Sequence, residues 1–295
     1  ATVGLAHQRQ HELRRPAHRG EGTVHEDRPL QQSRRLGQGG LQVEVAAINV
    51  YLAVLSIPLA CSFDRKVRFV RFWPALFPAI AIMMALFIPW DIAFTERGIW
   101  GFNPDYLSGI WVAGIPLEEW LFFLCIPYAC LFTYESLKHY IPNPVGGAFA
   151  IPASALLAVL CAGLAAQHTD RWYIGMTCVL TGLLAAGLAY GASRWASVRQ
   201  WNHRLWFADI PLLLPFIASN GVLTGLRFWE YPAHNRDVAA ISDQIVWYNN
   251  EENSGWRLFT MPVDDLLYGL LLIGINVSLF EAFSARGTSS VQIHA

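Results

Sequence analysis

Seven apolar segments follow one another along this chain, and they constrain its fold more than any other feature of the sequence. They lie near residues 45–63, 72–90, 116–134, 145–166, 172–192, 205–226 and 262–283. A helix of about 20 residues crosses the ~30 Å hydrocarbon layer of a bilayer. Charged residues make up only 15% of the sequence, against about 25% in a typical soluble domain. The sequence therefore predicts an all-α polytopic membrane protein with about seven transmembrane helices.

The Lys and Arg residues between these segments predict how the bundle is oriented, because positive charge gathers on the cytoplasmic side of a membrane. The connection after the first helix carries four of them, and the connection before the sixth helix carries three. The connections after the second and fourth helices carry one each, and the connection after the sixth carries two, or three with Arg227 at the helix end, together with five acidic residues. We therefore expect the amino end of the first helix outside and the carboxyl end of the chain in the cytoplasm.

Residues 1–44 differ in composition from the rest of the chain. They contain seven arginines, five acidic residues and four histidines, with almost no apolar periodicity. Such a segment has too little apolar surface to form a packed core. We expect it to be a disordered tail or an artefact of the reading frame, and we expect residues 287–295 to form a second tail.

Two parts of the chain resemble each other at an offset of 146 residues. Residues 99–124, IWGFNPDYLSGIWVAGIPLEEWLFFL, align without a gap with residues 245–270, IVWYNNEENSGWRLFTMPVDDLLYGL. The alignment pairs identical or chemically similar residues: Asn103 with Asn249, Pro116 with Pro262, Glu118 with Asp264, and Glu119 with Asp265. The chain is therefore predicted to contain two copies of one helical unit.

The order of the helices predicts that the two copies run in the same direction through the membrane. Helices two and three correspond to helices six and seven, so each copy has three helices. An odd number of crossings requires one extra helix between tandem copies. We predict a first copy at residues 45–140, a linking helix at 141–170 and a second copy at 171–286.

Two adjacent acidic residues open the third and seventh helices. Acids in the first turn of a helix interact favourably with the macrodipole by about 0.3–1 kcal/mol, and this capping role remains one interpretation. Two acids in both copies are more than capping requires. Burial opposes the ionisation of carboxyl groups, so these four residues could supply a general acid and a general base in one apolar chamber: Glu118, Glu119, Asp264 and Asp265.

Three stretches of the chain resemble the small membrane lycopene cyclases of bacteria, which occur as two three-helix subunits or as one fused chain. They are FDRKVRFVRFWPALFPAI, GIWGFNPDYLSGIWVAGIPLEEWLFFLCIPYACLFTYESL and PVDDLLYGLLLIGINVSLFE. The resemblance covers roughly residues 46–285. The family signature is Pro-x-Glu followed by Glu or Asp. The first copy fits it, whereas the second has Asp264 in the place of Glu, so its pair either reaches the substrate or tunes the first pair.

This resemblance implies a redox-neutral cyclisation by an isomerase of the intramolecular lyase class. An acid protonates the terminal double bond of lycopene, the tertiary cation closes a six-membered ring, and a neighbouring proton leaves. The implied products are γ-carotene and β-carotene, with an ε-type or other carotenoid cyclase as the alternative. The implied catalytic residues are the four acids, and the implied location is a bacterial cell membrane. Lycopene or a related carotenoid in the bilayer would be the substrate, and other enzymes of the carotenoid pathway are candidate partners.

Further residues could contact the substrate or support the acids. Aromatic faces attract a cation, although aromatic residues also form belts at membrane interfaces. Asparagines could orient carboxyl groups or form turns, and an acid at the end of helix two could join the acid cluster or be solvated. These candidates are Asp91, Trp90, Trp100, Phe102, Asn103, Trp120, Phe122, Phe123, Asn249 and Tyr268.

Other classes of function fit the sequence less well. A net charge of -1 argues against a nucleic-acid partner. No GxGxxG motif predicts a flavin or nicotinamide cofactor, and the cysteines and histidines lack the spacing of a metal site. A retinal protein would need a lysine in helix seven, but the only lysines are Lys66 and Lys138. A proton-coupled carrier is the main alternative, since intramembrane carboxylates also mark proton relays.

Overall fold

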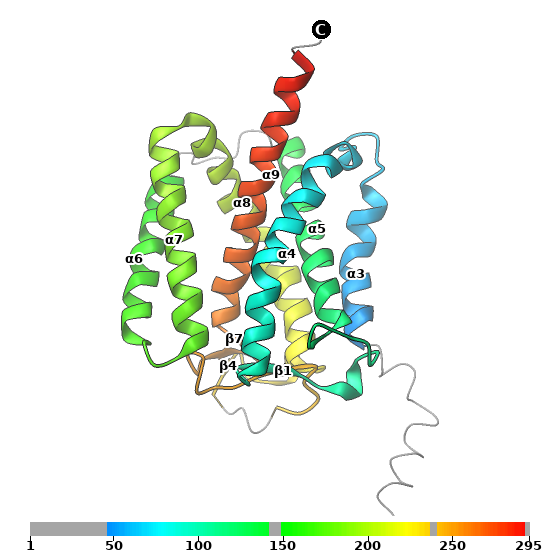
Figure 1. Cartoon of the computed structure of the whole chain (residues 1–295), viewed down its shortest axis with the longest axis vertical. Helices are drawn as coiled ribbons and strands as arrows, with labels where there is room; N and C mark the ends of the chain where they lie inside the picture. Colours follow the sequence, from blue (N-terminus) through cyan, green and yellow to red (C-terminus); the bar gives the residue numbers. More distant parts are fainter. Residues whose placement is uncertain (1–45, 142–148, 237–240, 293–295) are drawn as a thin grey trace, which may run out of the picture. The chain divides into compact units, whose positions relative to one another are not determined.

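The computed structural model describes residues 46–141, 149–236 and 241–292, which belong to one compact unit. The expected tail at 1–44 lies outside the described residues, as do residues 293–295 of the second tail. Within the described part, seven helices are present (Figure 1): α3 Ala46–Cys61, α4 Trp73–Glu96, α5 Leu117–Tyr140, α6 Ala150–Gln167, α7 Trp172–Arg194, α8 Ala196–Thr224 and α9 Asp264–Gln292.

Helix length and composition confirm the predicted class of an all-α polytopic membrane protein. Six of the described helices are long and apolar enough to cross a membrane. The described part of α3 has 16 residues and is about 24 Å long. Four helices extend well beyond their predicted ends: α4 continues to Glu96, α5 continues to Tyr140, α8 begins at Ala196 rather than at residue 205, and α9 continues to Gln292. Hydropathy marks the part of a helix that lies in lipid, and the polar residues at the start of α8 extend it beyond that layer.

The helices alternate in direction along the chain, and the second copy repeats the order of the first. In Figure 1 the chain passes up through α3, down through α4 and up through α5, and it does the same through α7, α8 and α9. Helix α6 links the two copies along the chain, and it lies at the left edge of the bundle in Figure 1, beside α7. The contacts repeat as well: α3 packs on α5 as α7 packs on α9, and α4 packs on α9 as α8 packs on α5.

Short strands at one end of the bundle join the two copies. Strand β1 (Trp100–Phe102) pairs antiparallel with β5 (Val246–Tyr248), and Gly101 lies opposite Trp247. These two residues are 146 positions apart, so each strand is the counterpart of the other. The flanking hydrogen bonds repeat too. The amide of Asn103 donates to the carbonyl of Ile245 at 2.8 Å, and the amide of Asn249 donates to the carbonyl of Ile99 at 2.9 Å.

The loops before α5 and α9 have similar hairpins in the two copies. Strands β2 (Trp111–Val112) and β3 (Ile115–Pro116) form a hairpin that matches β6 (Arg257–Leu258) and β7 (Met261–Pro262), and β4 (His234–Asn235) adds to β6. Gly109 and its counterpart Gly255 both have positive φ angles, of 79° and 75°. These strands could not be predicted from the sequence, because two or three residues are too few for an alternating pattern.

Candidate active site

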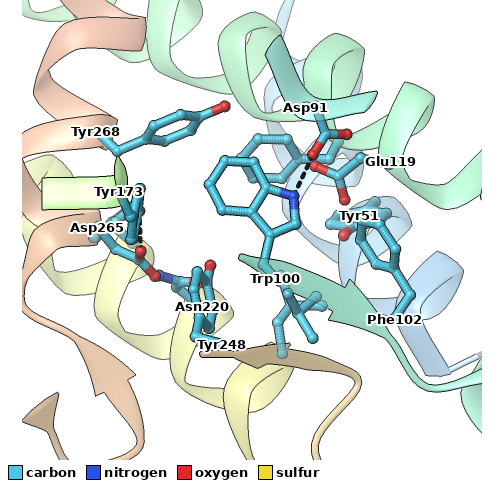
Figure 2. Close-up of a pocket in the computed structure, with 14 residues that line it drawn as sticks. Tyr51, Asp91, Trp100, Phe102, Glu119, Tyr173, Asn220, Tyr248, Asp265 and Tyr268 are labelled. Carbon is cyan, nitrogen blue, oxygen red and sulfur yellow. Dashed lines mark hydrogen bonds between the residues drawn. The ribbon is translucent and has the colours of Figure 1, made fainter. Parts of the chain in front are cut away.

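A cavity of about 540 Å³ lies between the two copies, at the end of the bundle that carries the strands. Both copies contribute to its wall. It is lined by Tyr51, Asp91, Trp100, Phe102, Glu119, Phe122, Tyr173, Phe216, Asn220, Leu223, Val246, Tyr248, Asp265 and Tyr268 (Figure 2). We call it the acid cavity, because one acid of each adjacent pair and the additional acid Asp91 line it.

The first group of acids in this cavity is formed by Glu119 and Asp91. Figure 2 shows their carboxyl groups near each other, and the two interact electrostatically. The indole N–H of Trp100 donates to Asp91 Oδ1 at 2.6 Å. The second oxygen, Asp91 Oδ2, is buried and has no hydrogen-bond partner in the described part of the chain. Two carboxyl groups therefore lie near each other, and the Trp100 indole donates a hydrogen bond to one of them.

The third acid in the cavity is Asp265, which lies apart from the first two and differs from them in its hydrogen bonds. The phenol of Tyr173 donates to Asp265 Oδ1, and the side-chain amide of Asn220 donates to Asp265 Oδ2 at 2.6 Å. Tyr248 of strand β5 lies beside it. Burial, and then the nearby Asp265 and Glu119, raise the pKa of the Tyr248 phenol well above its ordinary value of 10.0. Neutral donors thus surround Asp265, which suits an ionised carboxylate.

Trp100 lies between the two groups of acids (Figure 2). Its ring centroid is 5.2 Å from that of Tyr173 and 6.2 Å from those of both Tyr248 and Tyr268. Its N–H points to Asp91, so the ring is fixed by a hydrogen bond and by aromatic contacts. The cavity therefore offers carboxyl groups on two sides and electron-rich ring faces between them, the surroundings that favour a transient cation.

The first acid of each pair points away from the cavity. Glu118 Oε1 accepts from the backbone amide of Ser108 at 2.6 Å. Its counterpart Asp264 accepts from the backbone amide of Ser254 at 3.1 Å and from the Ser254 hydroxyl at 2.6 Å. The expectation that all four acids face one chamber thus differs from the structure. Glu118 and Asp264 hold the preceding loop against the helix start, and their catalytic role stays a prediction.

The predicted aromatic residues fall into two groups. Trp100, Phe102, Phe122 and Tyr268 line the acid cavity. The others lie behind its wall or beside the loop: Trp90 packs on Tyr268 with ring centroids 5.3 Å apart, Phe123 packs on Phe87, and the Trp120 N–H donates to the Val112 carbonyl. These three residues support the cavity through packing and the hairpin.

The predicted asparagines form turns rather than contacts with the acids. The side-chain oxygen of Asn103 accepts from the Asp105 amide at 3.1 Å, and that of Asn249 accepts from the Glu251 amide at 3.0 Å. Of the two interpretations of these asparagines, the structure agrees with turn formation. Their backbone amides close the β1–β5 pair, so they act on the cavity only through that pair.

Several residues of the cavity were missing from the predicted site. They are Tyr51, Tyr173, Phe216, Asn220, Leu223, Val246 and Tyr248. Two of them carry a signal in the sequence, because Asn220 is polar within an apolar helix and Tyr248 is the counterpart of Phe102 at the offset of 146. Tyr51 and Tyr173 lie in α3 and α7, outside the gapless part of the repeat, and no motif marks them.

The acids of the cavity do not form a metal site in the part of the chain that the structure describes. No three side chains of His, Cys, Asp or Glu come together there in a way that could hold an ion. Asp91 and Glu119 are adjacent, but the aromatic ring of Trp100 lies between them and Asp265.

A family model described as Lycopene cyclase matches two segments of the chain, residues 45–137 and 170–283. The two segments cover more than half of the chain, and the whole of α6 lies between them. Comparison with the curated proteins gave no match. Comparison with the solved structures gave none either.

Proposed function

The chain belongs to the lycopene cyclase family, and from this premise we propose that it is a lycopene β-cyclase whose proton chemistry takes place in the acid cavity. It is an integral membrane enzyme of carotenoid cyclisation, and its substrate is a carotenoid. One observation carries the proposal for the site: Glu119 of the first copy and Asp265 of the second line the same largely aromatic cavity. Each adjacent acid pair thus places one carboxyl group in the cavity, where both can act on the same end group of the substrate.

We assign the proton donor to the pair of Glu119 and Asp91. Two carboxyl groups that lie close together and are shielded from water do not both ionise, so the pair retains one proton. Glu119 delivers this proton to the terminal double bond of lycopene, and a tertiary cation forms on the neighbouring carbon. The next double bond attacks that cation and closes a six-membered ring. The ring faces of Trp100 and Tyr268 stabilise the positive charge during closure.

We assign the base to Asp265. The hydrogen bonds from Tyr173 and Asn220 hold its carboxylate in place on the other side of Trp100. Asp265 accepts the proton that leaves the cyclised cation, and the final double bond forms in the ring. One proton is added and one is removed, so the reaction consumes no oxidant or reductant and is an isomerisation. We propose that the proton leaves the carbon whose deprotonation gives the β ring. Loss of a proton from the other carbon next to the cation would give the ε ring.

Expression in a lycopene-accumulating host tests this function. Membranes from cells that express the chain should contain γ-carotene and β-carotene in place of lycopene when the pigments are separated by chromatography. ε-Ring pigments would identify the alternative cyclase. Unchanged lycopene, with the chain verified in the membrane fraction, would contradict the proposal.

A further inference from the structure

A second cavity of about 940 Å³ adjoins the acid cavity and runs between three helices. Its walls are formed by residues within 53–58 of α3, 122–133 of α5 and 212–223 of α8, together with Ile273 of α9. We call it the apolar groove. Ile57, on its α3 side, is 70% exposed, so the groove is open at the surface of the bundle that faces lipid.

The hydroxyl groups in this groove are already paired within their own helices. Thr133 donates to the Ala129 carbonyl at 2.9 Å, and Ser219 donates to the Pro215 carbonyl at 2.8 Å. The remaining polar residue, Asn220, is bonded to Asp265 at the boundary with the acid cavity. The groove therefore offers hydrocarbon walls along its length and polar chemistry only at one end. Such a surface suits a long apolar chain without functional groups.

The groove leads into the acid cavity. Four residues line both spaces: Phe122, Phe216, Asn220 and Leu223. From Phe122 to Thr133 the groove extends about 16 Å along α5, roughly half of the ~30 Å hydrocarbon layer. A ligand with one end at Glu119 and Asp265 can thus continue between α3 and α8 toward the lipid.

We propose that the apolar groove holds the unreacted polyene tail of the carotenoid while one end group lies in the acid cavity. This assignment rests on the proposed function. The substrate then enters sideways from the bilayer between α3 and α8, and its apolar chain exchanges lipid contacts for protein contacts. Because the tail occupies the groove, one end group reacts at a time, and the second end requires release and rebinding in the opposite direction.

Bulky substitutions in the groove test this assignment. Ala53→Trp and Thr133→Trp fill the groove from α3 and α5 without changing a residue of the acid cavity. Ala60→Trp is the matched control, because Ala60 is exposed on the same helix and does not line the groove. Each variant is given lycopene and an acyclic apocarotenoid that has the same end group and a tail cut to about half. Membrane level and thermal unfolding of each variant are measured in parallel.

The two groove variants should convert lycopene at least about tenfold more slowly and should convert the short-tailed substrate within about twofold of wild type. Ala60→Trp should convert both substrates normally. Wild-type turnover of lycopene in both groove variants, or equal loss of both substrates in them, would overturn the groove assignment alone. A wild-type chain that converts neither substrate would overturn the proposed function and the groove assignment with it.

Discussion

Neighbouring residues on a helix point about 100° apart, and this rotation separates the two acids of each adjacent pair. Glu119 and Asp265 reach the acid cavity, whereas Glu118 and Asp264 bond to the loops ten residues before them. The sequence predicted the acids and their equivalence in the two copies. It could not predict which acid faces inward, because the two are adjacent, similar in chemistry and equally suited to the start of a helix.

We propose that Glu118 is a positioning residue for the loop rather than a proton donor. Glu118→Gln keeps an oxygen that can accept from the Ser108 amide, so turnover should stay within about threefold of wild type while the fold is retained. Glu118→Leu leaves that amide without its partner, and the loss should lower stability by about 1–3 kcal/mol. Thermal unfolding in detergent and pigment analysis measure the two effects.

The comparison of these two variants separates loop support from proton transfer. If Glu118→Gln abolished cyclisation while the protein unfolded at the wild-type temperature, Glu118 would itself be required as an acid. The positioning role would then be wrong for the first copy. Asp264→Asn is the equivalent test in the second copy.

At the scale of elements, the helices could be predicted and the strands could not. The apolar segment of each helix indicates which part crosses the membrane, but α8 and α9 also contain polar residues that extend beyond this segment. The repeat aligned residues 99–103 with 245–249 but gave no indication that β1 and β5 pair with each other. That pairing is a tertiary contact between counterparts, and it fixes the position of Trp100, Phe102 and Tyr248 in the cavity.

The β1–β5 pair should depend on the absence of a side chain at Gly101. A Cβ atom at this position would collide with the indole ring of Trp247, so Gly101→Ala should separate the strands and displace Trp100 and Phe102. We expect turnover to fall by about tenfold or more. Gly163→Ala is the control, because a Cβ there meets no neighbouring atom and alanine is favoured in a helix.

Pigment analysis and membrane level are measured for both glycine variants. Normal turnover in Gly101→Ala would mean that the paired strands do not position the cavity residues. A comparable loss in Gly163→Ala would mean that the assay responds to small changes anywhere in the bundle.

At the scale of the whole molecule, positive charge differs between the two ends of the bundle. Arg65, Lys66, Arg68 and Arg71 lie between α3 and α4, and Arg194 and Arg199 lie at the junction of α7 and α8. This end is opposite to the strands (Figure 1). We propose that the arginine-rich end faces the cytoplasm of a bacterial cell and that the acid cavity lies in the outer half of the membrane.

Cysteine labelling tests this orientation. In a background without the five native cysteines, Ser242→Cys near the strands should react with a membrane-impermeant maleimide in intact cells. Lys66→Cys should react only after the membrane is permeabilised. The reverse pattern would place the strands and the acid cavity on the cytoplasmic side.

The two copies should form one active site, because Glu119 and Asp265 come from different copies and line one cavity. The most direct test is the rate of lycopene loss in membranes that contain Glu119→Gln or Asp265→Asn at wild-type protein level. Each single variant should lose at least about 100-fold in turnover, since each removes an acid or base from the same reaction. If either variant kept about half of the wild-type rate, each copy would have its own site and a shared cavity would be contradicted.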